Sequence, residues 1–126
     1  RAIERTVAYL RERKAFGGPL LSMQYIQYTL AELIVEIESL RQLAYAAAEG
    51  IVAGDDVTRL ATMAKFKAGR LVRRVADTCL QFHGGMGYME EMWTARYFRD
   101  SRLLGIGGGA DEVMLRVLTK TEGLEA

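Results

Sequence analysis

The sequence is poor in the residues that build disulfide frameworks and metal centres. Its 126 residues include one cysteine, one histidine and one proline. The single thiol, Cys79, has no partner for an internal disulfide and belongs to no Cys-x-x-Cys pattern. No glutamate stands three residues before His83, so the Glu-x-x-His pairs of di-iron bundles are absent. We therefore expect no metal site, and a reducing compartment fits the lone thiol.

The sequence also lacks an excess of charge and any long apolar run. Seventeen basic residues against sixteen acidic residues leave a formal net charge of +1. This balance gives no electrostatic reason to expect nucleic acid or a membrane as a partner. No apolar run approaches the ~20 residues that cross a bilayer, and no signal-peptide pattern is present. The length suits one domain.

What is present is a helical pattern punctuated by glycine and proline. We expect a first helix over residues 1–14, broken by the sequence Phe-Gly-Gly-Pro-Leu at residues 16–20. Ser22 is then expected to cap a long amphipathic helix that ends near Gly50. Its apolar positions alternate spacings of four and three residues: Ile26, Leu30, Leu33, Ile37, Leu40, Ala44 and Ala47.

A second long helix is expected from Val57 to Phe82. The turn before it contains two aspartates, either of which can cap the helix, and the glycine cluster at residues 84–88 ends it. A short helix over residues 93–99 and a last helix from about Asp111 to Thr121 complete the chain. Strand signals are nearly absent. The sequence predicts an all-α fold, an antiparallel four-helix bundle with short extra helices.

The first residues begin in the middle of a helical pattern. Neither a capping residue nor a methionine precedes the first apolar position, Ile3. We interpret the chain as a piece of a longer protein.

Few side chains in this pattern suggest chemistry. His83 falls at a predicted helix end, where capping is a more natural role than catalysis. The Gly-Lys-Ser/Thr of a phosphate loop does not follow the stretch Gly105–Gly109, and no predicted strand precedes it as in a dinucleotide-binding motif. The stretch is therefore either a turn or a ligand-binding loop. Arg13, beside Phe16 and two glycines, is either a solvated helix-end residue or a contact for a nucleotide.

Three motifs together indicate a family. They are Arg11-Glu12-Arg13-Lys14-Ala15-Phe16-Gly17, then Gln81-Phe82-His83-Gly84-Gly85-Met86-Gly87-Tyr88, then Arg99-Asp100-Ser101-Arg102 leading to Gly108-Gly109-Ala110-Asp111-Glu112. In order and spacing they resemble the C-terminal helical domain of acyl-CoA dehydrogenases over essentially the whole chain.

The resemblance implies a flavoenzyme in which an N-terminal helical domain and a middle β domain precede residues 1–126. Such enzymes remove two hydrogens from the α and β carbons of an acyl-CoA with FAD. Electron-transfer flavoprotein is their usual acceptor. It also implies a homo-oligomer, a dimer or tetramer, in the bacterial cytoplasm or the mitochondrial matrix. The 126 residues alone are expected to be inactive.

The resemblance implies a cofactor-binding role for several residues. Arg13 would bind the pyrophosphate of a neighbouring subunit's FAD, and Phe16 would lie against its adenine. Gln81 and the backbone of the 84–88 cluster would line the same groove. The full set implied is Arg13, Phe16, Gln81, Gly84, Gly85, Gly87, Gly109, Ala110 and Glu112.

The family's catalytic glutamate is missing. Its aligned position is Gly108, preceded by Gly107 where many relatives have tyrosine, and glycine cannot take up a proton. Glu112 lies inside the next predicted helix, in the wrong place for a base. Isovaleryl- and long-chain-type members carry the base on an earlier helix, which would fall before Arg1. The space left at Gly107 and Gly108 would suit a bulky, branched or long acyl chain.

Three interpretations stay open on the sequence. The chain belongs to an active dehydrogenase with its base upstream, to a non-catalytic subunit that binds FAD, or to a helical assembly module without flavin. Self-association is expected in each case, because several apolar residues lie beyond the core stripe of the first long helix. These are Met23, Tyr25, Tyr28 and Tyr45.

Overall fold

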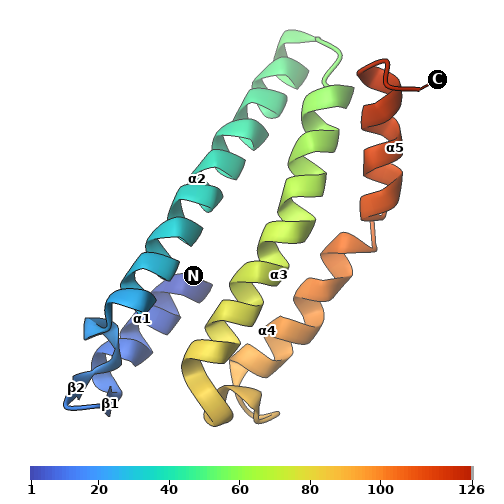
Figure 1. Ribbon diagram of the computed structural model, residues 1–126. Helices are drawn as coiled ribbons and strands as arrows, with labels where there is room; N and C mark the ends of the chain where they lie inside the picture. The colour runs from blue at the N-terminus through green and yellow to red at the C-terminus, as the bar shows by residue number, and fades with distance from the viewer. Residues whose placement is uncertain (126) are drawn as a thin grey trace.

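A computed structural model describes residues 1–125 of the chain as a bundle of helices (Figure 1). Its elements are α1 (Ala2–Glu12), β1 (Lys14–Ala15), β2 (Gly18–Pro19), the 3-10 turn η1 (Leu20–Ser22), α2 (Gln24–Ala53), α3 (Thr58–Tyr88), α4 (Trp93–Ser101), the 3-10 turn η2 (Arg102–Gly105) and α5 (Asp111–Thr121). The long helices α2 and α3 run antiparallel, and α3 also packs against α1, α4 and α5. The predicted all-α fold is confirmed.

Two clusters of buried side chains hold the bundle together. The first joins α1, the start of α2 and the second half of α3, and contains Leu10, Ile26, Leu30 and Phe82. The second lies along the α2–α3 contact and contains Leu33, Leu71, Val75 and Cys79. Ion pairs flank this contact where Lys67 meets Glu36 and Arg74 meets Glu32. Lys67 lowers the pKa of the Glu36 carboxyl through its hydrogen bond and its charge.

The ends of α2 differ from the prediction. Ser22 does not cap it, because Ser22 belongs to η1 and its hydroxyl donates to the Pro19 carbonyl at 2.7 Å. Gly50 does not end it either, and α2 continues to a left-handed Gly54. The bare Cα of Gly50 has another use, since a Cβ there would lie 2.7 Å from a methyl group of Val57. The glycine therefore permits close packing of the α2–α3 connection.

The end of α3, Tyr88, lies within the glycine cluster that was predicted to end it. At the start, the N-cap residue is Val57, which makes no side-chain cap, and the Asp56 carboxylate just before it accepts the backbone N–H of Thr58 at 2.9 Å. Near the other end, Gly84 (φ 61°, ψ −151°) breaks the helical dihedral angles inside α3. This conformation is essentially restricted to glycine, and α3 resumes as far as Tyr88.

His83 directly precedes the break at Gly84, but it is buried in the core and does not cap an exposed helix end as expected. Its side chain is 3% exposed. The ring stacks on Tyr9 at 4.2 Å between centroids and meets the edge of Trp93 at 5.5 Å. Its Nδ1 lies 2.7 Å from the Cys79 carbonyl, which makes Nδ1 the protonated nitrogen and leaves the thiol out of the contact. His83 is a core residue.

Burial also acts on the ionisation of both residues. It lowers the pKa of His83, and it raises the pKa of the Cys79 thiol. The backbone hydrogen bond to Cys79 opposes the shift of His83, and the charge of Arg5 adds to it. The imidazole is therefore neutral and the thiol protonated in the folded protein near neutral pH.

We predict that the protonation of His83 makes folding sensitive to acid. Below pH ~6.5 the unfolded chain binds a proton at this residue that the folded protein does not, so the free energy of unfolding falls as the pH falls. Chemical denaturation between pH 8 and 5 should show the stability gap between the wild-type protein and His83→Phe narrowing toward low pH. A gap of constant size would contradict this role.

Candidate functional site

A groove lies where the end of α1, the β1–β2 hairpin and the second half of α3 meet, with a volume of about 490 Å³. We call it the Arg13 groove. It is lined by Tyr9, Arg13, Ala15, Phe16, Leu20, Met23, Tyr25, Ile26, Gln81, Phe82, His83, Gly84, Gly85 and Met86. Five of the nine residues predicted to bind cofactor are in this set. The fold therefore joins two motifs that are more than sixty residues apart in the sequence.

Arg13 presents its side chain from a fixed backbone. Its N–H donates to the Tyr9 carbonyl at 2.9 Å, and its own carbonyl accepts from the Leu20 N–H at 2.8 Å. The guanidinium itself is exposed and forms no ion pair within residues 1–125. A permanently charged fork held in this way suits an anion with several oxygens.

Phe16 stands at the tip of the hairpin in an unusual conformation. Lys14 pairs with Pro19 and Ala15 with Gly18, which leaves Phe16 and Gly17 as a two-residue turn. Both have positive φ, 54° and 89°, as a type I′ turn requires. Left-handed backbone costs a bulky residue about 1–3 kcal/mol. Its ring is nevertheless 91% exposed, so neither packing nor backbone preference accounts for this residue. A ligand with a flat face would.

The α3 side of the groove is bare backbone. A Cβ added at Gly84 or at Gly85 would meet no atom within 4 Å, so this face is open. Gln81 is exposed one turn earlier. Gly87 faces the other way, toward α4: its carbonyl accepts the Thr94 hydroxyl at 2.7 Å, and a Cβ would lie 2.6 Å from that of His83. Gly87 thus lets the turn before α4 pack closely.

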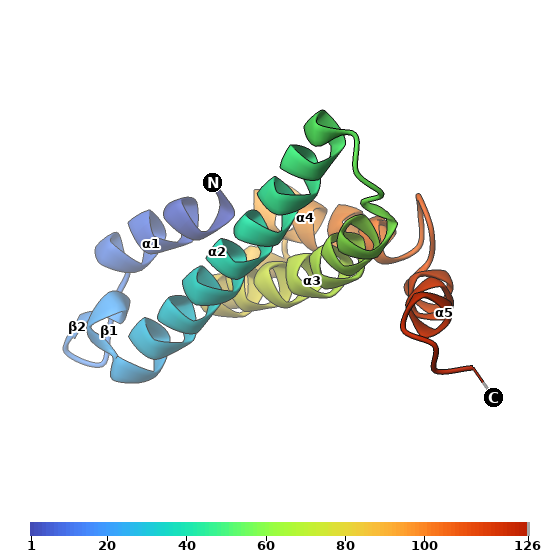
Figure 2. The same cartoon turned by 90° about the horizontal axis from the view of Figure 1, so that it is seen from above.

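The remaining predicted residues form a second group far from the groove. Gly109, Ala110 and Glu112 lie at the start of α5, which is distant from the β1–β2 hairpin in both views (Figure 1, Figure 2). Gly108 and Gly109 have φ values of 66° and 102°. The structure therefore places five of the nine residues in the Arg13 groove, three at the start of α5 and Gly87 against α4, and the glycine stretch is not part of the Arg13 groove.

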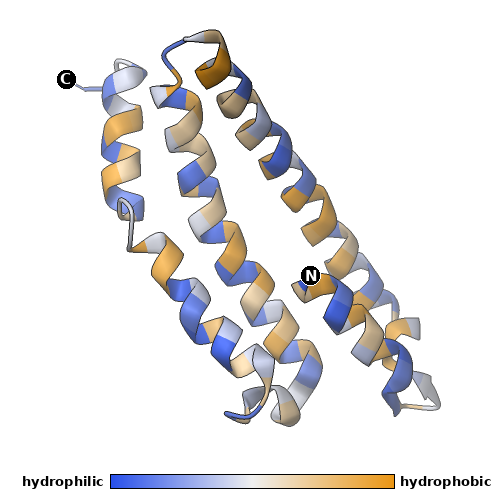
Figure 3. Cartoon of the chain, turned by 180° about the vertical axis from the view of Figure 1, so that it is seen from behind, coloured by the Kyte–Doolittle hydropathy of each residue, from blue (hydrophilic) through white to orange (hydrophobic). Residues whose placement is uncertain are grey.

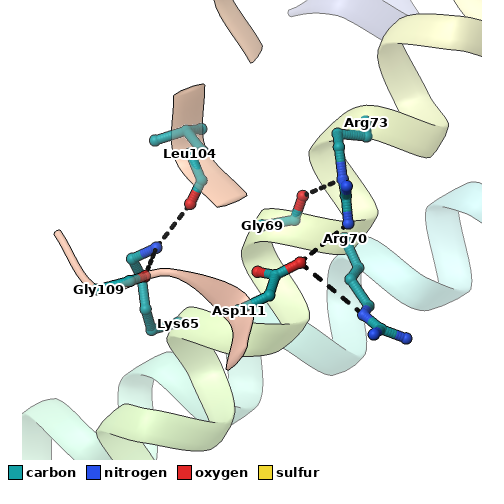
Figure 4. A network of polar contacts seen from close by, with 7 residues as sticks. All are labelled: Lys65, Gly69, Arg70, Arg73, Leu104, Gly109 and Asp111. Carbon is teal, nitrogen blue, oxygen red and sulfur yellow. Dashed lines mark hydrogen bonds and ion pairs between the residues drawn. The ribbon is translucent and has the colours of Figure 1, made fainter. Parts of the chain in front are cut away.

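The start of α5 is held against α3 by residues that the sequence analysis did not single out (Figure 4). The Lys65 ammonium donates to the carbonyls of Leu104 at 2.6 Å and Gly109 at 3.2 Å. Arg73 donates to the Asp111 carboxylate at 2.9 Å and to the Gly69 carbonyl at 3.2 Å. A glycine inside a helical pattern, Gly69, was the one available sign of close packing.

The carboxylates near Gly108 are badly placed to act as a base. The Asp111 side chain is 10% exposed, and one of its oxygens is held by Arg73. The other oxygen is buried with no hydrogen-bond partner. Glu112 is exposed on the first turn of α5.

Within residues 1–125, no three histidine, cysteine, aspartate or glutamate side chains gather as metal ligands would. No helix of that part of the chain combines the length and apolarity that crossing a membrane requires.

Comparison with known proteins agrees with this fold and these motifs. The probable acyl-CoA dehydrogenase YngJ of Bacillus subtilis is 37% identical over 119 residues, which are 94% of this chain and 31% of that protein. CarC, a subunit of the caffeyl-CoA reductase–Etf complex of Acetobacterium woodii, is 31% identical over 118 residues, again 94% and 31% of the two chains. The chain thus spans about a third of the length of these relatives.

A solved structure shows the same arrangement. A putative acyl-CoA dehydrogenase from Mycobacterium smegmatis superimposes with a TM-score of 0.96 at 37% identity, over 100% of this chain and 33% of that one. Residues 1–122 also match the family described as acyl-CoA dehydrogenase, C-terminal domain. The chain belongs to the acyl-CoA dehydrogenase family, and it is the C-terminal helical domain of that family that its sequence and fold match.

Proposed function

We propose that the chain is part of an FAD-dependent enzyme that removes hydrogens from the α and β carbons of an acyl-CoA thioester. In this proposal residues 1–126 supply binding surface for FAD and part of the oligomer core, in the bacterial cytoplasm or the mitochondrial matrix. Electron-transfer flavoprotein is the proposed acceptor. The observation that carries the proposal is the Arg13 groove, where charge, an exposed ring and bare backbone meet.

The residues of this groove fit the adenosine diphosphate half of FAD. Arg13 would hold the pyrophosphate, because its guanidinium has a fixed charge and no partner in residues 1–125. Phe16 would stack on the adenine, and this contact would explain why an exposed aromatic residue stands at a strained backbone position. Gly84 and Gly85 would let the cofactor lie against backbone. When bound, FAD would accept the hydride from the β carbon. Gly109, Ala110 and Glu112, at the start of α5, are also proposed to bind FAD, at a site separate from the Arg13 groove.

The base that takes the α proton is proposed to lie upstream of Arg1. Gly107 and Gly108 offer no carboxylate, and Asp111 is held by Arg73. The absence of a side chain at Gly108 leaves room for a bulky, branched or long acyl chain. The same absence favours a second candidate, a non-catalytic subunit that holds FAD for a partner. The alternative of a helical assembly module without flavin does not explain Phe16, because an exposed ring at a strained backbone position does not stabilise a bundle.

The exposed apolar side chains of α2 fit the proposed homo-oligomer, a dimer or tetramer. Hydrophobic residues recur along the length of α2 (Figure 3). The exposed apolar residues of this helix and its start are Met23, Tyr25, Tyr28, Ile34, Val35, Tyr45, Ile51 and Val52. Contact with another subunit would remove these apolar side chains from water.

Anaerobic titration of the full-length protein with acyl-CoAs of different length and branching tests the proposal. We expect at least one acyl-CoA to bleach the absorbance of the bound flavin. Bound flavin that no member of the panel bleaches would favour the non-catalytic subunit, and purification without flavin would favour the assembly module.

Replacing Arg13 tests the groove separately. Arg13→Ala in the full-length protein should weaken FAD binding by about 1.5–3 kcal/mol, the range for a hydrogen bond to a charged group. FAD dissociation followed by flavin fluorescence measures this. Arg11→Ala, which removes an exposed charge from the same helix outside the groove, is the matched control. Equal losses in the two variants would remove Arg13 from the site.

Restoring a carboxylate at position 108 should do little. Gly108→Glu places a side chain on left-handed backbone, at a cost of about 1–3 kcal/mol, with its Cβ 3.7 Å from Cε of Lys65. Turnover should not rise if an upstream base already works. Gly108→Ala separates backbone strain from the effect of the carboxylate. A large gain in turnover specific to Gly108→Glu would instead favour the non-catalytic subunit.

A further inference from the structure

The glycine stretch from the end of η2 toward α5, residues 105–109, has few side chains to hold it in one conformation. We call it the glycine loop. Four of its five residues lack a side chain, and the fifth, Ile106, is exposed. Within the loop and η2, the backbone N–H groups of Ile106 and Gly107 both donate to Leu103. Glycine loses more conformational freedom on ordering than any other residue, so such a loop needs restraints from outside.

Three positions one turn apart on α3 supply them: residues 65, 69 and 73, on one face of the helix (Figure 4). At the first, one ammonium bonds the carbonyl just before the loop, Leu104, and the carbonyl of its last residue, Gly109. A single charged group thereby joins the two ends of the loop. Hydrogen bonds from a charged donor are about twice as strong as neutral ones.

The other two positions fix the loop's distance from α3. A Cβ at Gly69 would lie 2.9 Å from an Asp111 oxygen and 3.2 Å from the Gly105 Cα, so the contact exists only because residue 69 is glycine. Arg73 then holds the other Asp111 oxygen. These contacts anchor the loop at its two boundaries, with Gly107 and Gly108 exposed between them.

We propose that Lys65 is a positioning residue for the reaction, acting through the glycine loop. This rests on the proposed function, in which the space at Gly108 takes the acyl chain. In this proposal Lys65 acts through the loop backbone and not through contact with the substrate. It keeps the exposed residues 107 and 108 in one conformation, and displacement of reacting groups by about 1 Å can cost on the order of 100-fold in rate.

The test uses the full-length, FAD-loaded protein with Lys65→Met, which keeps most of the stem and removes the donors. We expect unchanged flavin content, a kcat at least ~10-fold lower at saturating acyl-CoA, and faster amide hydrogen exchange at residues 105–109. Lys65→Arg, which keeps the charge and the donors, should recover most of the rate. Lys67→Met is the control, since Lys67 pairs with Glu36 away from the loop.

Wild-type kcat in Lys65→Met, or loop exchange no faster than in Lys67→Met, would overturn the proposal. So would equal losses of kcat in the two variants. If Lys65→Met does not fold, Lys65→Gln gives the same comparison, because its shorter amide cannot bridge both carbonyls. A wild-type protein whose flavin no acyl-CoA reduces would contradict the proposed function instead, and loop exchange would still test whether Lys65 holds the loop.

Discussion

The close packing of α3 against its neighbours is the constraint on which the rest of the structure depends. A helix can approach other elements closely only where its own side chains leave room. Gly69 provides that room for η2 and the start of α5, and Gly87 provides it for the turn before α4. Elsewhere α3 contributes Leu71, Val75 and Phe82 to the two buried clusters. The helix α3 thus packs against α1, α2, α4 and α5 through large apolar side chains at some positions and through glycine at others.

The same helix determines where the two functional places form. Its break at Gly84 turns bare backbone toward Arg13, while the face of Lys65, Gly69 and Arg73 holds the glycine loop. Each place therefore combines a rigid element with a segment that has little structure of its own. The hairpin holds Phe16 at a positive φ that its side chain disfavours, and the loop holds Gly108 and Gly109 at positive φ.

The helices could be predicted from the sequence because apolar residues recur with helical spacing, but glycine misled the prediction of one of their ends. Gly50 was interpreted as a stop, whereas it allows close packing; at Gly84 the helical dihedral angles do break, and α3 ends at Tyr88 inside the predicted cluster. His83 was expected to cap a helix end, whereas Tyr9, distant in the sequence, and Trp93, across a turn, pack against its ring. Physical reasoning left Arg13 undecided between solvent and ligand, and its cofactor role is a proposal that comes from the family resemblance. The contacts of Lys65 span 39 and 44 residues, and no local pattern reveals them.

The burial of Cys79 has a consequence for how the domain can be observed. The chain's one thiol has no exposed surface and a raised pKa, so a thiol reagent meets neither an accessible sulfur nor a thiolate while α1, α2 and α3 are packed. Its modification requires the helices to separate. The rate of labelling at this single sulfur therefore reports how often the bundle core opens, and no cysteine has to be introduced to measure it.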